Sequence, residues 1–457
     1  MTQIQVNFNH AIQKIKPMHA MGQPPFAGGF LSFDFSYIKH LQNAHVPYSR
    51  LHDVDGLYGG NRFVDIPNLF RDFDADENDP ASYDFAFTDT LIEGLVRAGV
   101  EPYFRLGVTI EVWHRIKAYR IFPPKDFEKW ARICEHVVAH YIDGWANGFH
   151  FPISYWEIWN EPDDGYREET GAMWRGTPEE YFKLYEVTAK HLKGIFGDRI
   201  KVGGYGACGM YEYRKDEGRN GEIEVNDMFT HVIWFMHRFL AYQKEAGAPL
   251  DFYSWHLYDS YLHGGIDFLE VRDHALYVRE TLDQYGFYSA ESHLNEWNIY
   301  CFLDRRDAPR GASRTLALML MMQDTSTDLM CYYDAGLAAS QYKSFLNPDN
   351  LHPYRTYYAF PMFHSLYRLE NECAVEVGDP MLFVGAAKNG SRASVVIANT
   401  TGETLDIALS LGGFEADEVL IHRIDEENRY TETHEALGSC ITVPADGCVE
   451  ISLYKLA

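Results

Sequence analysis

Short apolar segments alternate with longer amphipathic segments over most of the chain, and this alternation predicts parallel strands connected by helices. We count eight strand-like segments between residues 26 and 366, with helix-like segments between them. Eight such units are typical of a (β/α)8 barrel, which needs about 250 residues. The expected strands are Phe26–Phe33, Pro47–His52, Glu101–Val108, Ser154–Asn160, Ile200–Gly204, Phe252–Tyr258, Ser292–Trp297 and Leu329–Tyr333.

Three of the expected helices have clear signals. Over Pro124–Asp143, apolar side chains recur at intervals of three and four residues, as they do on one face of a helix. The segment Thr177–Glu180 has Thr as N-cap, Pro at the first helical position and Glu three residues after the cap, which predicts a helix start with a capping box. Ser313–Gln323 is apolar on all sides, so we expect it to be buried on several sides.

The pattern changes beyond Leu366, where short alternating strands are separated by turn signals such as Asn389–Gly390. This change predicts a small antiparallel β-sandwich. Such a domain could bind glycan, brace the barrel or mediate assembly, and bracing is the default interpretation. Residues 3–8 also alternate, which makes this segment a candidate to pair with the C-terminal strands. We therefore predict an α/β fold with a (β/α)8 barrel at 17–366 and a β-sandwich accessory domain at 367–457, joined by an N-terminal strand within 1–16.

Two of the expected strands have a glutamate that follows an asparagine at or next to their carboxyl ends. Ser154–Pro162 (SYWEIWNEP) ends at Asn160, Glu161 and a proline, and the strand stops there because proline cannot donate a ladder hydrogen bond. Much later in the chain, His293–Asn298 (HLNEWN) places Glu296 in a similar context. The carboxyl ends of barrel strands are where such enzymes carry their chemistry. Two carboxylates at that end are what the hydrolysis of a glycosidic bond requires.

Composition narrows the classes of partner. The formal net charge is −26, from 40 Lys and Arg against 66 Asp and Glu. The negative electrostatic field of such a charge repels nucleic acid and anionic membranes, so we expect neither as a partner. The same field favours a neutral substrate. There is no apolar run of about 18 residues and no signal-peptide pattern, which favours a cytoplasmic protein without transmembrane helices. The seven cysteines show no C-x-x-C spacing and are expected to be reduced thiols.

Metal ions and organic cofactors are not expected, because a pair of carboxylates suffices for glycoside hydrolysis. His52 and Asp53 come at the end of the second strand and could in principle act as metal ligands. Neighbours on a strand point to opposite faces, however, so we do not expect these two side chains to share one metal ion. A metal-dependent barrel hydrolase is therefore the third-ranked alternative.

These motifs resemble those of glycoside hydrolase family 39, which contains retaining β-xylosidases and α-L-iduronidases of clan A. The resemblance covers residues 26–366 and implies a (β/α)8 barrel and a retaining glycosidase. Four segments are similar to strands two, four, six and seven of the family and two to its helices three and four: Pro47–Val54, Trp156–Pro162, Asp251–Tyr258, Ser292–Asn298, Pro123–Trp130 and Glu180–Lys190.

The resemblance also implies roles for single residues. It implies that Glu161 is the general acid/base and Glu296 the nucleophile, and that Arg50 keeps Glu296 ionised. We expect the two carboxyl groups to lie about 5–5.5 Å apart, as in retaining enzymes. We also expect nearby tryptophans to raise the pKa of Glu161. The supporting residues that the resemblance implies are Asn160 for the sugar 2-hydroxyl, Tyr258 for the nucleophile, and His52, His256 and Tyr333 for the sugar pocket.

The chain departs from the family pattern in two places. It reads Cys331–Asp334 (CYYD) where the xylosidases of the family carry a tryptophan on strand eight, and Asn295–Asn298 (NEWN) around the nucleophile. These departures alter the wall of the sugar pocket. The resemblance as a whole implies a retaining exo-glycosidase of β-xylosidase type, cleaving terminal sugars from plant-type oligosaccharides by double displacement.

Several alternatives stay open. A member of the same family could act on galactose, arabinose or α-L-iduronate, and an iduronidase would need cations such as Arg105, Arg115 and Lys117 for the substrate carboxylate. A catalytically silent carbohydrate-binding barrel is a further alternative. The sequence leaves the oligomeric state open, including a homo-oligomer.

Overall fold

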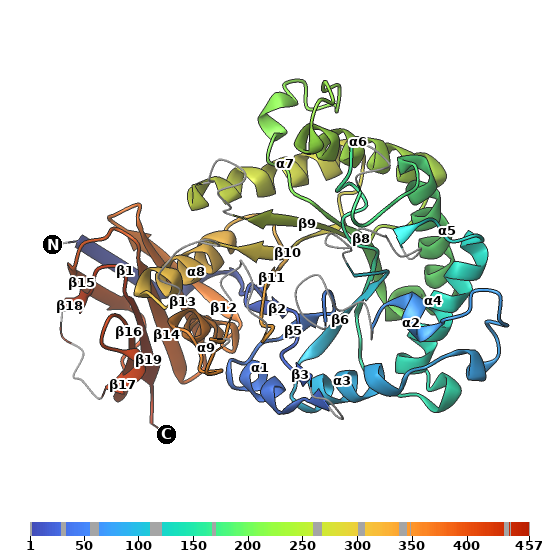
Figure 1. Cartoon of the computed structure of the whole chain (residues 1–457). Helices are drawn as coiled ribbons and strands as arrows, with labels where there is room; N and C mark the ends of the chain where they lie inside the picture. The colour runs from blue at the N-terminus through green and yellow to red at the C-terminus, as the bar shows by residue number, and fades with distance from the viewer. Residues whose placement is uncertain are drawn as a thin grey trace.

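The computed structural model contains a closed barrel of eight strands beside a separate β-sheet (Figure 1). It describes residues 2–28, 33–54, 64–109, 121–166, 171–258, 267–299, 307–337, 345–347, 349–433, 438 and 440–456. All neighbouring barrel strands are parallel, which confirms the predicted (β/α)8 fold class. The barrel strands are β2 (Ala20–Gly22), β5 (Tyr48–Arg50), β6 (Glu101–Leu106), β7 (Tyr155–Ile158), β8 (Lys201–Ala207), β9 (Phe252–Tyr258), β10 (Glu291–Asn298) and β11 (Leu329–Tyr332).

The first barrel strand lies earlier in the chain than predicted. β2 pairs with β11 and β5, whereas the described residues of the expected strand Phe26–Phe33 lie outside the barrel. Within that range, β3 (Ala27–Gly28) and β4 (Phe33–Asp34) form a small antiparallel sheet of their own. The prediction was wrong because β2 has three residues, too few to show an alternating pattern. Each of the other seven expected ranges overlaps one barrel strand.

The helices surround the barrel, and the three with clear sequence signals are present (Figure 1). At the start of α5, the Thr177 hydroxyl accepts a hydrogen bond from the Glu180 amide and the Glu180 carboxylate accepts one from the Thr177 amide, which is the expected capping box. Nearly all of α8 is buried, as its apolar sequence predicts. The α-helices are α1 (Lys39–Asn43), α2 (Ile66–Leu69), α3 (Ala86–Arg97), α4 (Phe127–Ile142), α5 (Pro178–Phe196), α6 (Met228–Ala246), α7 (Val271–Gln284), α8 (Pro309–Met322) and α9 (Arg355–Tyr367).

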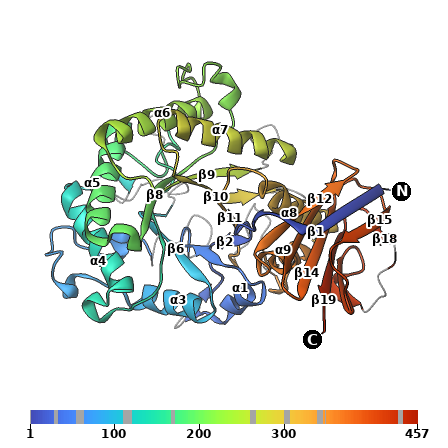
Figure 2. The same ribbon diagram turned by 180° about the vertical axis from the view of Figure 1, so that it is seen from behind.

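Eight C-terminal strands and one N-terminal strand form a nine-stranded sheet in the order β17-β16-β19-β14-β13-β12-β1-β15-β18. The N-terminal strand β1 runs antiparallel to β12 and parallel to β15, and Figure 2 shows it lying among the C-terminal strands. The N-terminal segment therefore pairs with the C-terminal sheet, as considered from the sequence. The strands are β1 (Thr2–Lys14), β12 (Asn371–Val377), β13 (Leu382–Asn389), β14 (Arg392–Asn399), β15 (Leu405–Gly412), β16 (Glu418–Ile424), β17 (Arg429–Thr433), β18 (Cys440–Val443) and β19 (Cys448–Tyr454).

The sheet packs on the barrel through α8 and α9. Ala387 of β13 and Val396 of β14 belong to the same apolar core as the helices of the barrel. A Cβ atom at Gly385 would lie 2.7 Å from the side chains of Leu320 and Leu366, so a glycine there permits the close approach. This shared core is what allows the sheet to brace the barrel. In the part of the chain that the structure describes, we found no helix with the length and hydropathy needed to span a membrane.

Candidate active site

Glu161 lies just beyond β7, at the carboxyl end of the barrel strands. Trp159 and Glu161 have left-handed backbone conformations, with φ of 74° and 44°. The Glu161 amide donates hydrogen bonds to the carbonyls of Tyr205 (3.1 Å) and Gly206 (3.0 Å) at the end of β8. Non-glycine residues rarely adopt this conformation without support from their surroundings. These bonds to β8 therefore help to fix the direction of the Glu161 side chain, which is 15% exposed.

Glu296 lies on β10 and is held by two hydrogen-bond donors. Arg50 Nη1 lies 2.5 Å from Glu296 Oε1, and the Tyr258 hydroxyl donates to Oε2 at 2.7 Å. The side chain of Glu296 is 7% exposed. Bonds of this kind stabilise a carboxylate in its charged form. The hydrogen bonds expected from Arg50 and Tyr258 are therefore both present.

Arg50 binds two further partners besides Glu296. Its Nε donates to Glu157 Oε2 at 2.7 Å, and its Nη2 donates to Asn160 Oδ1 at 2.6 Å. Burial disfavours the charge of Arg50, but the carboxylates of Glu157 and Glu296 raise its pKa above the ordinary value. Arg50 is therefore a permanent cation. The other oxygen of Glu157 accepts hydrogen bonds from Ser254 and Asn295, both at 2.6 Å.

The two candidate catalytic carboxylates face each other. One oxygen of Glu161, one oxygen of Glu296 and a ring nitrogen of His256 all lie within 4.8 Å of one another. His256 Nδ1 is 2.6 Å from Glu161 Oε1 and 3.5 Å from Glu296 Oε2. This upper limit is close to the carboxyl spacing of about 5–5.5 Å in retaining glycosidases and lies below the about 6.5–9.5 Å of inverting enzymes.

Burial shifts the pKa values of Glu161 and His256 in opposite directions, because in both cases it favours the neutral form. It raises the pKa of Glu161 to about 7, even though the nearby Arg50 cation acts in the opposite direction. Burial also lowers the pKa of His256 to about 4, so its imidazole is neutral at neutral pH. The indole of Trp159 packs on the rings of Trp130 and Trp174, with centroid distances of 5.7 and 5.1 Å. Glu161 can therefore hold a proton near neutral pH.

The remaining predicted residues line the same end of the barrel. Asn160 is fully buried, and its Nδ2 has no hydrogen-bond partner among the described residues, which leaves a donor for a ligand. His52 Nε2 is 3.8 Å from Glu296 Oε1, and burial lowers the pKa of His52 well below its ordinary value. The Tyr333 hydroxyl donates to Asp53 Oδ2 at 2.8 Å and accepts from Gln23 Nε2 at 2.5 Å.

The expectation that His52 and Asp53 point to opposite faces is wrong. His52 Nε2 lies 3.4 Å from Asp53 Oδ1, so both side chains turn to the same region. β5 ends at Arg50, and Asp53 has a left-handed φ of 49°, so strand alternation no longer applies there. Burial and the nearby Glu296 carboxylate raise the pKa of Asp53 to about 8, which favours the neutral acid near neutral pH.

The sequence reasoning missed Glu157 as a member of this site, and it considered Asp53 only as a metal ligand. Glu157 is a fully buried charge within the otherwise apolar SYWEIW strand, which was a usable signal. Of the cations considered for a substrate carboxylate, Arg105 is buried and its Nη2 already donates to Asp65 at 2.7 Å. Arg115 and Lys117 lie outside the described residues.

Comparisons with known proteins identify the family of this chain. The sequence profile of the glycosyl hydrolases family 39 matches residues 37–283. Over 217 residues the chain is 27% identical to a β-xylosidase of Geobacillus stearothermophilus, covering 45% of this chain and 36% of that protein. Over 384 residues it is 24% identical to a β-xylosidase of Caldicellulosiruptor saccharolyticus, covering 76% of this chain and 71% of that protein.

The match therefore spans about a third of the length of the first relative and about seven tenths of the second. The crystal structure of a glucosidase from Croceicoccus marinus has the same overall fold, with a TM-score of 0.79 and 21% identity over 100% of this chain and 99% of that one. The family profile covers more than half of the 457 residues, and the chain belongs to the glycosyl hydrolases of family 39.

Proposed function

We propose that this protein is a retaining exo-glycosidase of β-xylosidase type that releases terminal sugars from plant-type oligosaccharides. The observation that carries the proposal is the approach of Glu161 and Glu296, whose oxygens lie within 4.8 Å across the barrel mouth. The two relatives named β-xylosidase support xylose as the sugar. The net charge of −26 favours a neutral substrate.

In the first step, the ionised Glu296 attacks the anomeric carbon while the bond to the leaving-group oxygen breaks. Arg50 and Tyr258 hold the Glu296 carboxylate in place for this attack. Protonated Glu161 gives its proton to the departing oxygen, so the leaving group departs as a neutral alcohol. The products of this step are a glycosyl ester on Glu296 and an ionised Glu161.

In the second step, Glu161 acts as a base. It takes a proton from a water molecule as the water oxygen attacks the anomeric carbon, and the ester bond to Glu296 breaks. Glu296 leaves as a carboxylate, and Glu161 is protonated again. Two inversions at the same carbon give net retention. Neutral His256, 2.6 Å from Glu161, keeps that carboxyl group oriented in both steps.

The supporting residues bind the sugar around this centre. The Nδ2 of Asn160 has no hydrogen-bond partner in the described part of the chain and is suited to donate to the 2-hydroxyl, an interaction that strengthens in the transition state. His52 and Tyr333 form the wall on the side of β5 and β11, together with Asp53. A wall of these polar groups replaces the tryptophan expected in xylosidases of the family.

Replacement of Glu296 by Ala tests the proposal. We expect turnover of 4-nitrophenyl β-xyloside to be abolished and azide to restore cleavage, with release of the α-glycosyl azide. Glu291→Gln is a matched control, because Glu291 lies at the opposite end of the same strand and pairs with Lys201. Normal hydrolysis by the Glu296→Ala variant would overturn the assignment. A panel of xylosides, galactosides and arabinosides identifies the sugar, and tight sugar binding without any hydrolysis would favour the silent barrel.

A second candidate function is metal-dependent hydrolysis, because Glu161, His256 and Glu296 present ligand atoms within 4.8 Å of one another. The Arg50 guanidinium, 2.5 Å from Glu296, already supplies the positive charge that a cation would bring. We therefore expect full activity after dialysis against EDTA. Loss of activity that zinc or another divalent ion restores would favour the metal-dependent reaction.

A further inference from the structure

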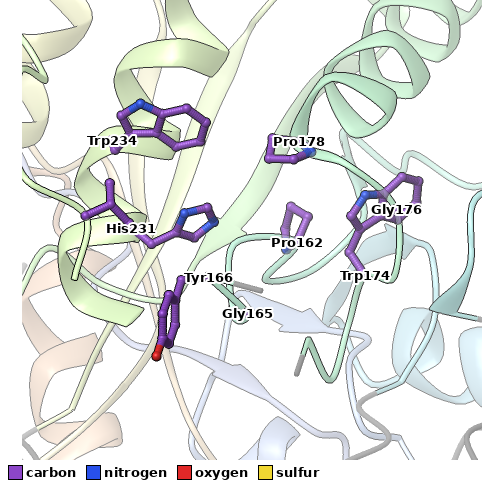
Figure 3. A pocket seen from close by; sticks show the side chains of 9 residues that line it. Pro162, Gly165, Tyr166, Trp174, Gly176, Pro178, His231 and Trp234 are labelled. Carbon is purple, nitrogen blue, oxygen red and sulfur yellow. The ribbon is translucent and has the colours of Figure 1, made fainter. Parts of the chain in front are cut away.

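Buried charge near Glu161 lies inside the barrel and not in the neighbouring cavity. The cavity, with a volume of about 310 Å³, lies between the starts of α5 and α6, and its described lining residues carry no formal charge (Figure 3). Inside the barrel, by contrast, Glu157 of β7 is fully buried. A carboxylate removed from water is unfavourable unless charged and polar groups compensate for it. The partners of Glu157 therefore indicate what its charge does.

Three strands supply the partners of Glu157. Arg50 of β5 donates from Nε to Oε2 at 2.7 Å. Ser254 of β9 and Asn295 of β10 donate to Oε1, both at 2.6 Å. All three partners are buried. Because each partner comes from a different strand, the carboxylate is fixed relative to the barrel as a whole.

Glu157 orients the guanidinium group that holds the candidate nucleophile. Besides the bond from Nε to Glu157, Arg50 donates from Nη1 to Glu296 Oε1 at 2.5 Å. Its Nη2 donates to Asn160 Oδ1 at 2.6 Å. A guanidinium group is planar, so a bond at Nε restricts the directions of the other two nitrogens. The contact with Glu157 therefore helps to aim Arg50 at both residues.

The hydrogen bond alone does not account for a charged group at this position. A glutamine could accept the same bond from Arg50 Nε without the unfavourable burial of a negative charge. The charge of Glu157 offsets that of Arg50, which would otherwise act fully on Glu296. A carboxylate that is stabilised more strongly by a cation is a weaker nucleophile, so this offset favours attack by Glu296.

The same offset favours the protonated form of the candidate acid. Burial is the main cause of the raised pKa of Glu161, the Arg50 cation lowers this pKa, and the Glu157 carboxylate raises it. The titratable or charged groups around Glu161 are Arg50, Glu157, Asp163, Cys208, His256 and Glu296.

We infer that Glu157 is a positioning residue of the reaction, which orients the Arg50 guanidinium toward Glu296 and offsets its positive charge. This inference rests on the proposed function. Because Glu157 is fully buried, it acts through Arg50 and not by contact with the substrate. A carboxylate with a purely structural role would affect stability, whereas a positioning residue also changes the pH profile of the reaction.

Two substitutions separate charge from orientation, with methyl β-xyloside as a substrate whose leaving group needs a proton. Glu157→Gln keeps the length of the side chain and removes the charge, so the alkaline limb of kcat/KM should move to lower pH. Glu157→Asp keeps the charge but is shorter by a methylene group. In this variant the limb should stay in place while kcat falls about 10²-fold, as expected for a misplacement of about 1 Å.

The fold should tolerate Glu157→Gln. Arg50, Glu157 and Glu296 together bury one cation and two anions, and the substitution leaves one of each. Asn295 Oδ1 has no hydrogen-bond partner among the described residues, so the amide of Asn295 can rotate and accept from the new glutamine. Circular dichroism and the thermal midpoint check the fold of both variants.

Glu291→Gln is the matched control, because Glu291 lies at the opposite end of β10 and pairs with Lys201. It should keep the wild-type kcat and pH profile. Wild-type kinetics and pH profile in Glu157→Gln would overturn the inference. Equal losses in both Glu157 variants with an unmoved alkaline limb would also overturn it, because a purely structural role predicts that result.

An NMR titration separates the failure of this inference from the failure of the proposed function. If the wild type cleaves neither methyl β-xyloside nor any other glycoside of the panel, the proposed function fails. The charge effect is then measured on the ¹³C-labelled glutamate carboxyl groups, with Glu161→Gln to assign the Glu161 signal. A lower pKa of Glu161 in Glu157→Gln than in the wild type would support the inference, and an equal pKa would overturn it.

Discussion

The pKa of Glu161 leads to a prediction about the pH dependence of the reaction. Burial raises this pKa from the ordinary value of 4.5 to about 7. The difference corresponds to roughly 3 kcal/mol in favour of the protonated form. At pH 6, a carboxyl group with a pKa of 7 is about 90% protonated, whereas one with a pKa of 4.5 is about 3% protonated. The environment of Glu161 therefore raises the fraction of active acid about thirtyfold at this pH.

We expect kcat/KM of the wild type for a substrate with a poor leaving group to fall as the pH rises through about 7, because Glu161 then loses its proton. In Glu161→Gln this alkaline limb should disappear and kcat/KM should fall about 10²- to 10⁴-fold. With 2,4-dinitrophenyl β-xyloside, whose leaving group needs no proton, the first step should be nearly unaffected. Burst kinetics should then show a slowed second step in Glu161→Gln, because this variant also lacks the base that takes a proton from the attacking water.

Two results would refute this reasoning. The first is an alkaline limb near pH 4.5 in the wild type, which would mean that burial does not raise the pKa of Glu161. The second is the persistence of a limb near pH 7 in Glu161→Gln, which would assign the titration to another group. Glu291→Gln should keep the wild-type pH profile, because that residue lies at the far end of β10.

Three further substitutions test the groups around the carboxylate pair. Arg50→Met leaves the buried Glu157 and Glu296 without their cation and should lower the free energy of unfolding by about 3–5 kcal/mol; an unchanged urea midpoint would argue against this role. Gly206→Ala places a Cβ 3.0 Å from His256 Nε2 at a left-handed φ of 64°, so kcat should fall at least about tenfold, and wild-type turnover would contradict the expected strain. Asp53, with a pKa of about 8, stabilises the fold while it is protonated, and this contribution is lost as the pH rises from about 4 to about 8. The thermal midpoint of Asp53→Asn relative to the wild type should therefore increase over this range; a constant difference would refute the titration.

The fold class and the two central glutamates could be predicted from the sequence because both depend on local patterns. The alternation of apolar and polar residues that marks a strand or a helix is visible within one short segment of the chain. A glutamate at the end of an apolar strand is also easily recognised. In a parallel barrel all strand ends of one kind lie together, so Glu161 and Glu296 could be expected to meet. The boundaries of the domains remain a prediction.

Short elements and irregular turns limited the prediction. β2 was missed because a three-residue strand has no visible period. The positions of His52 and Asp53 were misjudged because the backbone leaves the strand conformation after Arg50. The hydrogen bond between His256 and Glu161 joins residues 95 positions apart, and the alternation of single strands contains no information on such a distance.

The sequence by itself determined that this chain forms strand–helix units and ends two of its strands in acidic residues, because these features follow from the local conformational preferences of the backbone. The tertiary structure alone decided how those residues act. Closure of the barrel sets the separation of the carboxylates, places Arg50 between three acceptors, and buries Glu161 deeply enough to raise its pKa. Distances between strands and burial depend on how all elements pack, and no single segment specifies them.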